Sequence, residues 1–217
     1  YGLAPTHKRL LECVANGSKV LDLGCATGYL AEGFAQKDCD VVGVEMDADA
    51  AQNARAFCSH VIVGDAGDAQ ILKQVPGPFD AIVCADILEH LSDPWSVMTE
   101  LLSKLKPGGK LLVSIPNVAY WKMRFDLLRG RFNYTETGLL DQTHLRFFTV
   151  NSFHVAASEC GYCVDSMIIN DGGLPGFPHP VDWDSMPGIV RWLVRVFSNL
   201  CVFHAIYVMT PQVEETS

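Results

Sequence analysis

An acid and two glycines stand at the end of an apolar run in Val20–Gly28, V-L-D-L-G-C-A-T-G. Glycine has no Cβ, so a strand-to-helix turn of this kind can bring its backbone against a ligand. Asp22 can either accept backbone N–H groups of the turn or face a cationic ligand. A second apolar run ends in Glu45, about 20 residues past Gly24, where a carboxylate meets the ribose hydroxyls of a nucleotide-type cofactor.

Four side chains could accept a proton during catalysis. Glu89 and His90 follow the apolar run 81–85, and Asp141 and His144 share the stretch D-Q-T-H. Histidine titrates near neutral pH and can take a proton from an attacking hydroxyl. We therefore expect catalytic roles for His144 as the general base, Asp141 as the group that orients it, and His90 as a positioning residue.

Three arginines occur close to these residues in the sequence. A guanidinium can hold a carboxylate or phosphate through two parallel hydrogen bonds. We expect substrate binding by Arg124, Arg131 and Arg146. No metal site is expected, because the C-x-x-C at 160–163 has neither a second pair nor a histidine cluster to complete it.

The composition favours a single enzyme domain. The chain has 217 residues, of which 49% are hydrophobic and 19% are charged, and this suits one doubly wound domain. A net charge of −9 argues against nucleic acid as the main substrate. The eight cysteines lack a regular disulfide spacing, which favours a cytoplasmic location. No signal peptide is visible. Because Tyr1 is not an initiator methionine, the sequence leaves open whether the chain is a fragment of a longer protein.

Apolar runs alternate with helical patterns along the chain. The pattern predicts strands near 18–23, 41–45, 60–64, 79–84 and 109–115, and helices near 5–16, 28–36, 48–57, 94–105 and 151–160. Such alternation implies an α/β fold with a parallel sheet, right-handed crossovers and helices on both faces. Ligands of these folds bind at the carboxyl ends of the strands.

The glycine loop resembles motif I of the class I S-adenosylmethionine (SAM) methyltransferases, which reads acid, any residue, Gly, three residues, Gly. Asp22, Gly24 and Gly28 match it, although Ala26 stands where many members have glycine. A dinucleotide loop, G-x-G-x-x-G, would need glycine at Ala26, which disfavours a nicotinamide oxidoreductase.

Three further segments resemble the family in order and spacing: V-I-V-G-D-A at 61–66, F-D-A-I-V-C-A-D-I-L-E-H-L at 79–91, and L-K-P-G-G-K-L-L-V-S at 105–114. The resemblance implies a Rossmann-like, doubly wound, mostly parallel seven-stranded sheet, with 164–169 and 203–209 as the last strands. It also implies binding of SAM and of its product S-adenosylhomocysteine (SAH). The residues that it assigns to the cofactor are Asp22, Gly24, Ala26, Gly28, Glu45, Met46, Asp65, Ala66 and Ala85.

Two segments exceed the minimal fold within one expected domain over 1–217. The segment 117–150 leaves the fifth strand and is rich in arginine and aromatic residues, so we expect a lid over the acceptor site rather than a mere surface excursion. The segment 171–199 ends in a predicted helix, 189–197, with Arg191 and Arg195 on one side. Packing on the sheet is favoured over membrane contact, because two positive charges are few for an acidic protein.

Residues 114–149 resemble narrower groups of bacterial methyltransferase-like proteins, associated with methionine biosynthesis or encoded beside glycosyltransferases for surface glycans. The prediction is methyl transfer from SAM to a small-molecule or glycan-type acceptor, at oxygen. The alternative is a catalytically silent SAM-binding partner of an acyltransferase or biosynthetic complex. The sequence leaves the acceptor, the need for a general base and the oligomeric state open.

Overall fold

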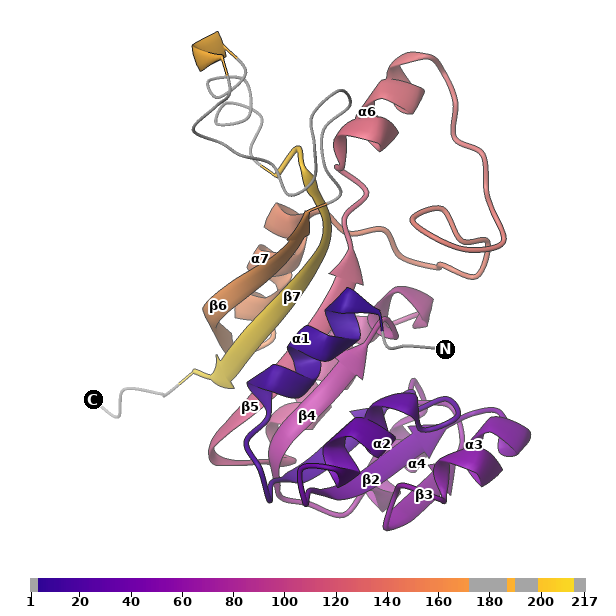
Figure 1. Ribbon diagram of the computed structural model, residues 1–217, viewed down its shortest axis with the longest axis vertical. Coiled ribbons are helices and arrows are strands. Elements are labelled where there is room, and N and C mark those ends of the chain that lie inside the picture. The colour runs from indigo at the N-terminus through magenta and orange to yellow at the C-terminus, as the bar shows by residue number, and fades with distance from the viewer. Residues whose placement is uncertain (1–3, 172–186, 190–198, 213–217) are drawn as a thin grey trace.

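The computed structural model describes residues 4–171, 187–189 and 199–212 (Figure 1). The strands of its sheet are β1 (Lys19–Leu23), β2 (Asp40–Glu45), β3 (His60–Val63), β4 (Phe79–Ala85), β5 (Leu105–Pro116), β6 (Tyr162–Asp171) and β7 (Val202–Pro211). The described helices are α1 (Pro5–Cys13), α2 (Tyr29–Ala35), α3 (Ala48–Ala54), α4 (Ala69–Gln74), the 3-10 helix η1 (Leu88–His90), α5 (Pro94–Leu102), α6 (Trp121–Leu128) and α7 (Val150–Glu159).

The strand order defines the class of fold. The seven strands form one sheet in the order β3-β2-β1-β4-β5-β7-β6. The first five are parallel, whereas β7 is antiparallel to both β5 and β6. The order reverses between β1 and β4, and ligands bind outside the carboxyl ends of the strands at such a switch point. The expected Rossmann-like, doubly wound, mostly parallel sheet is confirmed.

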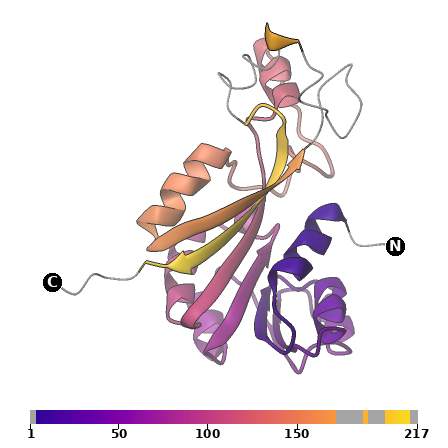
Figure 2. The same ribbon diagram turned by 60° about the vertical axis from the view of Figure 1, so that its left-hand side comes forward.

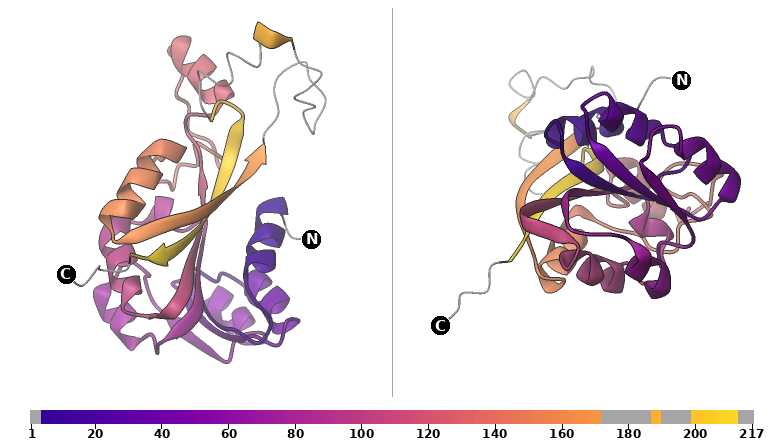
Figure 3. Two further views of the ribbon diagram at one scale, coloured as in Figure 1. Left: turned by 90° about the vertical axis from the view of Figure 1, so that its left-hand side faces the viewer. Right: turned by 90° about the horizontal axis from the view of Figure 1, so that it is seen from below.

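Helices cover both faces of the sheet (Figures 2 and 3). On one face, Leu72 of α4, Met98 of α5 and Phe153 of α7 belong to one buried cluster. On the other face, Leu10 of α1 and Phe34 of α2 belong to a second. Each fully buried side chain of this size contributes about 1.5–3 kcal/mol. The two clusters therefore fix the sheet and leave the strand ends available for polar groups.

Side-chain oxygens begin four of the helices. Asp47, Asp68 and Asp93 accept backbone N–H groups at the first turns of α3, α4 and α5. Thr149 caps α7 in a reciprocal pair with Ser152. Such caps satisfy N–H groups that lack partners inside the helix and contribute about 1 kcal/mol each.

Several element boundaries differ from the sequence prediction. Three helices end earlier than expected, at Cys13, Ala54 and Leu102. The last of these ends early because β5 already begins at Leu105. Two of the described α-helices were not predicted: α4 is too short to show a helical period, and α6 buries only Met123.

The first insertion leaves the carboxyl end of β5 and projects beyond the sheet (Figure 1). It contains α6 and a long irregular stretch that returns to the same edge. There the N–H of Val118 donates to the carbonyl of Phe148 at 2.9 Å. The buried amide of Asn117 donates to the carbonyl of Val202 at 2.7 Å. Both ends of the insertion are therefore joined to the sheet.

The second insertion, 171–199, lies largely outside the described residues, and so does the predicted helix with Arg191 and Arg195. A single domain over 1–217 stays a prediction. Within the described part of the chain, no helix combines the length and the apolar character that crossing a membrane requires.

Replacing Gly28 with alanine should destabilise the fold more than the same change at Gly17. Both glycines have positive φ, 85° and 72°, so both substitutions incur a left-handed strain of about 1–2 kcal/mol. Only at Gly28 would the new Cβ lie 2.8 Å from Cα of Ala54, whereas the space at Gly17 is open. Urea unfolding followed by circular dichroism measures both, and equal losses of stability would contradict the close packing of α2 against α3.

Candidate functional site

The loop between β1 and α2 is built from residues with positive φ. Gly24, Ala26 and Gly28 have φ values of 76°, 47° and 85°. The N–H of Gly24 donates to the carbonyl of Val44 at 2.9 Å, which ties the loop to the end of β2. A Cβ on Gly24 would lie 2.9 Å from the Ile87 side chain, so the loop also packs against the turn that follows β4.

Glu45 holds this loop from the end of β2. Its Oε2 accepts the N–H of Ala26 at 2.9 Å, and its Oε1 accepts the N–H of Asp47 at 2.8 Å. The first bond fixes Ala26 in the left-handed region, which glycine occupies without strain. Each carboxylate oxygen can still accept a second hydrogen bond, as two ribose hydroxyls would require.

Asp22 is buried beneath the loop without a hydrogen bond. Its residue is 1% exposed, and neither carboxylate oxygen has a partner among the described residues. Burial raises its pKa to about 7, with His7 opposing the shift and Glu45 adding to it. The loop N–H groups do not bond to Asp22, so the first of the two expected roles is not observed, and contact with a cationic ligand stays a prediction.

The other residues assigned to the cofactor lie at the ends of the neighbouring parallel strands. Met46 follows β2 and is 72% exposed. The exposed Asp65 follows β3, and its carboxylate accepts the N–H of Gly67 at 2.8 Å. Ala66 and Ala85 are buried. The sheet therefore brings the predicted residues to one edge, and their contacts with the cofactor stay predictions.

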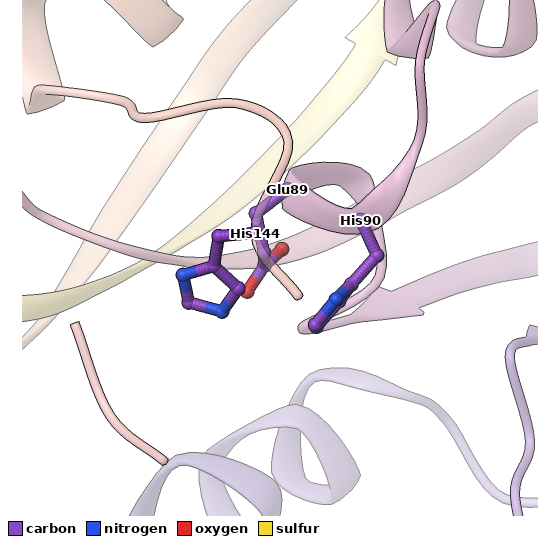
Figure 4. Close-up of side chains that lie close together, drawn as sticks. All are labelled: Glu89, His90 and His144. Carbon is purple, nitrogen blue, oxygen red and sulfur yellow. The ribbon is translucent and has the colours of Figure 1, made fainter. Parts of the chain in front are cut away.

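Glu89, His90 and His144 meet where η1 faces the insertion (Figure 4). Each offers a nitrogen or oxygen atom, and these three atoms lie within 4.8 Å of one another. Burial, and then Asp86, raise the pKa of the Glu89 carboxyl to about 8. Burial and the neighbouring His90 lower the pKa of His144. The His144 imidazole is therefore mainly neutral at pH 7 and can accept a proton.

Main-chain hydrogen bonds hold His144 in this position. The N–H groups of Leu145 and Arg146 both donate to the carbonyl of Glu89, at 2.8 and 3.0 Å. The guanidinium of Arg146 donates to the carbonyl of Ser92. The insertion is thereby anchored to η1 and to the turn before α5.

Asp141 does not orient His144 in the expected way. Its carboxylate instead accepts the N–H and the hydroxyl of Thr143, at 2.8 and 2.6 Å. The stretch forms a turn rather than a helix, so side chains three residues apart do not lie on one face. Asp141 therefore shapes the turn that presents His144, and a catalytic role for it stays a prediction.

The three arginines expected at the substrate differ in position. Arg131 lines a cavity of about 450 Å³ together with α6 residues and Phe203. Arg124 donates from Nε to the carbonyl of Ala119, and Arg146 bonds to Ser92 as described. Of the three, Arg131 is the one that faces a described cavity.

A second cavity, of about 230 Å³, contains the histidine cluster. Its lining includes Glu89, His90 and His144, and it shares Gly138, Leu139 and Phe203 with the larger cavity. Together they give a space of the size that small ligands occupy. The insertion forms one wall of this space, as expected for a lid.

One cluster at this edge was not predicted. Asp86 accepts hydrogen bonds from Ser114 at 2.7 Å and from Nε2 of His204 at 2.6 Å, and Nε2 of His7 lies 3.6 Å away. Burial opposes ionisation, but the bonds from His204 and His7 hold the pKa of Asp86 well below its usual range. The position of Asp86 directly after an apolar strand was the available signal. Its histidine partners lie in α1 and β7, which sequence spacing could not connect to it.

Comparison with known proteins identifies the family. Residues 1–166 match the family model Methyltransf_23, described as a methyltransferase domain. The chain belongs to this family of methyltransferase domains, and SAM is its cofactor.

Curated relatives match a smaller part of the chain than the family model does. The ubiquinone biosynthesis O-methyltransferase of Pseudomonas aeruginosa strain UCBPP-PA14 is 37% identical over 107 residues, which cover 46% of this chain and 45% of that protein. The chain thus spans less than half the length of this relative in the match.

Solved structures share the fold over most of the chain. A SAM-dependent methyltransferase from Archaeoglobus fulgidus has a TM-score of 0.66 at 17% identity, covering 94% of this chain and 90% of that one. Magnesium protoporphyrin IX methyltransferase from Synechocystis PCC 6803, solved with bound SAH, has a TM-score of 0.62 at 14% identity, covering 96% and 82%. These neighbours share the fold.

The buried Asp22 should make stability fall as pH rises. Its pKa is about 7 in the folded state and near 4 in the unfolded chain, so between these values the folded state holds the extra proton. Stability then decreases by up to about 1.4 kcal/mol per pH unit from roughly pH 5 to 7. Asp22→Asn, which resembles the protonated form, should remove this part of the slope in urea unfolding of the ligand-free protein. An unchanged slope would contradict the burial of an unpaired carboxylate.

Proposed function

We propose that this protein transfers a methyl group from SAM to a hydroxyl oxygen of a small molecule. The observation that carries the proposal is that two groups of residues lie at the same edge of the sheet. The glycine loop with Glu45 lies there, and the cavity with Glu89, His90 and His144 lies beside it. The contact between Gly24 and Ile87 joins the two sites, since Ile87 immediately precedes η1.

For this reaction the protein has to position the acceptor oxygen and remove the hydroxyl proton, and little else. The acceptor oxygen forms a bond to the methyl carbon as the carbon–sulfur bond breaks, and the electron pair of that bond stays on sulfur. SAH and the methyl ether are the products, and the hydroxyl proton passes to a base. Holding the oxygen in line with the carbon–sulfur bond accounts for much of the rate.

His144 is proposed as the acceptor of that proton. Its lowered pKa keeps the ring neutral at pH 7, and it lines the smaller cavity. Its Nδ1 lies 3.4 Å from the carbonyl of Leu139, which suits an Nδ1–H and leaves the lone pair on Nε2. The ring can then receive a proton without rearranging.

The cavities favour a compact acceptor with apolar and polar parts. The larger one is lined by Tyr120, Met123 and Phe203, and also by Arg131 and Asn133. Aromatic walls suit a ring, and the polar groups suit hydroxyl or acidic substituents. The O-methyltransferase activity named for the ubiquinone-biosynthesis relative supports oxygen as the acceptor atom. A glycan-type acceptor is the second possibility within the same chemistry.

Release of SAH tests the function. The protein is incubated with SAM and a panel of hydroxylated aromatic compounds and saccharides, and SAH is quantified by mass spectrometry. Methylation of one class identifies the acceptor. SAM binding without SAH release for any compound would favour the silent SAM-binding alternative instead.

Glu45→Ala should weaken SAM binding by about 1.5–3 kcal/mol, the scale for hydrogen bonds to a charged group, or roughly 10- to 150-fold. The variant loses the acceptor of two ribose hydroxyls and also the bond that holds Ala26. Calorimetry measures the affinity. Asp49→Ala, which removes an exposed carboxylate nearby in α3, serves as the control for net charge. Equal SAM affinities of the two variants would contradict the assignment of Glu45 to the cofactor site.

His144→Gln should lower turnover by about 100- to 10,000-fold, the usual contribution of a general base. SAM affinity should stay close to that of the unmodified protein, because His144 belongs to the acceptor cavity. His154→Gln changes an exposed histidine of α7 and is the control. His90→Gln shows how much the neighbouring ring contributes. Near-normal turnover of His144→Gln would place the base elsewhere or point to an acceptor that needs none.

A further inference from the structure

The cluster of Glu89, His90 and His144 has the composition of a metal site. Two imidazoles and one carboxylate converge, with one atom of each within 4.8 Å of the others. Two atoms that bind one ion at about 2.1 Å can be at most about 4.2 Å apart. Small side-chain rotations would therefore close the cluster around an ion.

Glu89 supplies an independent indication. It is 1% exposed, and its Oε2 has no hydrogen-bond partner among the described residues. A buried carboxylate without a partner is costly, and a cation removes that cost. Figure 4 shows its carboxylate near both rings, and the structure places no lysine or arginine in ion-pair contact with it among the described residues.

The two histidines are oriented as metal ligands usually are. Nδ1 of His90 lies 3.3 Å from the carbonyl of Thr143, and Nδ1 of His144 lies 3.4 Å from that of Leu139. A histidine that binds a metal through one nitrogen commonly donates its other N–H to such a carbonyl. These bonds leave Nε2 of each ring as the ligand atom.

The supporting backbone is fixed before any ion arrives. Glu89 and His90 are adjacent in η1, and the Glu89 carbonyl binds the two N–H groups that follow His144. Asp86 lies three residues earlier, but its carboxylate is engaged by Ser114 and His204. The ligand set from the described residues is therefore three side chains.

We propose that Glu89, His90 and His144 bind one divalent first-row transition-metal ion, such as Zn²⁺, Mn²⁺, Fe²⁺ or Co²⁺. Imidazole nitrogen favours these ions over Mg²⁺ and Ca²⁺, which prefer oxygen ligands. Three protein ligands leave positions open toward the cavity, as in catalytic metal sites. The role of the ion rests on the proposed methyl transfer, but it replaces His144 as the group that activates the acceptor. With Nε2 of His144 bound to the ion, the acceptor hydroxyl occupies an open position, where the ion lowers its pKa and orients its oxygen, and the hydroxyl proton passes to solvent.

Titration with Co²⁺ tests the site directly. The protein is freed of metal and of any affinity tag, and the visible absorption of bound Co²⁺ is followed. We expect saturation at one equivalent through nitrogen and oxygen ligands. Glu89→Gln, His90→Ala and His144→Ala should each weaken binding by at least about 10-fold, the smallest loss usual even for partners of metal ligands. His60→Ala and His154→Ala, at exposed histidines of β3 and α7, should bind as the unmodified protein does.

Thermal unfolding without metal shows whether each variant is folded, and Glu89→Gln keeps the shape of the protonated side chain. Absence of saturable Co²⁺ binding would overturn the proposal, as would binding that the three substitutions leave unchanged. Thiolate-type absorption would also overturn it by placing the ion on cysteine.

A second pair of measurements separates this inference from the proposed function. SAM affinity is measured by calorimetry, and SAH release is measured with and without a chelator. SAM-dependent methylation that a chelator leaves unchanged, in a protein that does not bind Co²⁺, would overturn the metal site alone. Co²⁺ binding at the three residues without SAM binding would overturn the proposed function and leave the metal site standing.

Discussion

The carbonyl of Glu89 accepts two backbone N–H groups from the insertion, and the acceptor side of the site depends on this contact. It joins η1, at the switch point of the sheet, to residues more than fifty positions later in the chain. These bonds join main-chain atoms, so they constrain the path of the insertion directly through its backbone. His144 reaches Glu89 and His90 because the next two N–H groups are bound there. The guanidinium of Arg146 strengthens the same anchor.

Two buried carboxylates give this edge of the sheet its chemical character. Asp22 lies under the glycine loop, Glu89 lies under the histidines, and both have raised pKa values because water is excluded. A chain selected for stability alone would replace such groups by apolar ones. Their presence on both sides of the Gly24–Ile87 contact indicates that the edge is built for ligands that compensate the lost hydration.

The cofactor side could be predicted from the sequence, whereas much of the acceptor side could not. Asp22, Gly24 and Gly28 form one contiguous motif, and Glu45 ends the neighbouring strand, so local patterns place them together. His90 and His144 were singled out by their chemistry, but their approach to each other depends on the fold of an irregular insertion. For Asp141, spacing suggested a contact that the turn does not make. The histidine partners of Asp86 come from opposite parts of the chain, which no local pattern could reveal.

The position of β7 has a consequence for how the site forms during synthesis. This strand is inserted between β5 and β6, and its His204 meets Asp86 beside η1, while His7 of α1 approaches the same carboxylate. A nascent chain that has emerged only as far as β6 has the complete glycine loop but lacks this wall of the cavity, and Asp86 lacks its strongest partner. The pocket can therefore close only after the ribosome has released the segment around residue 204.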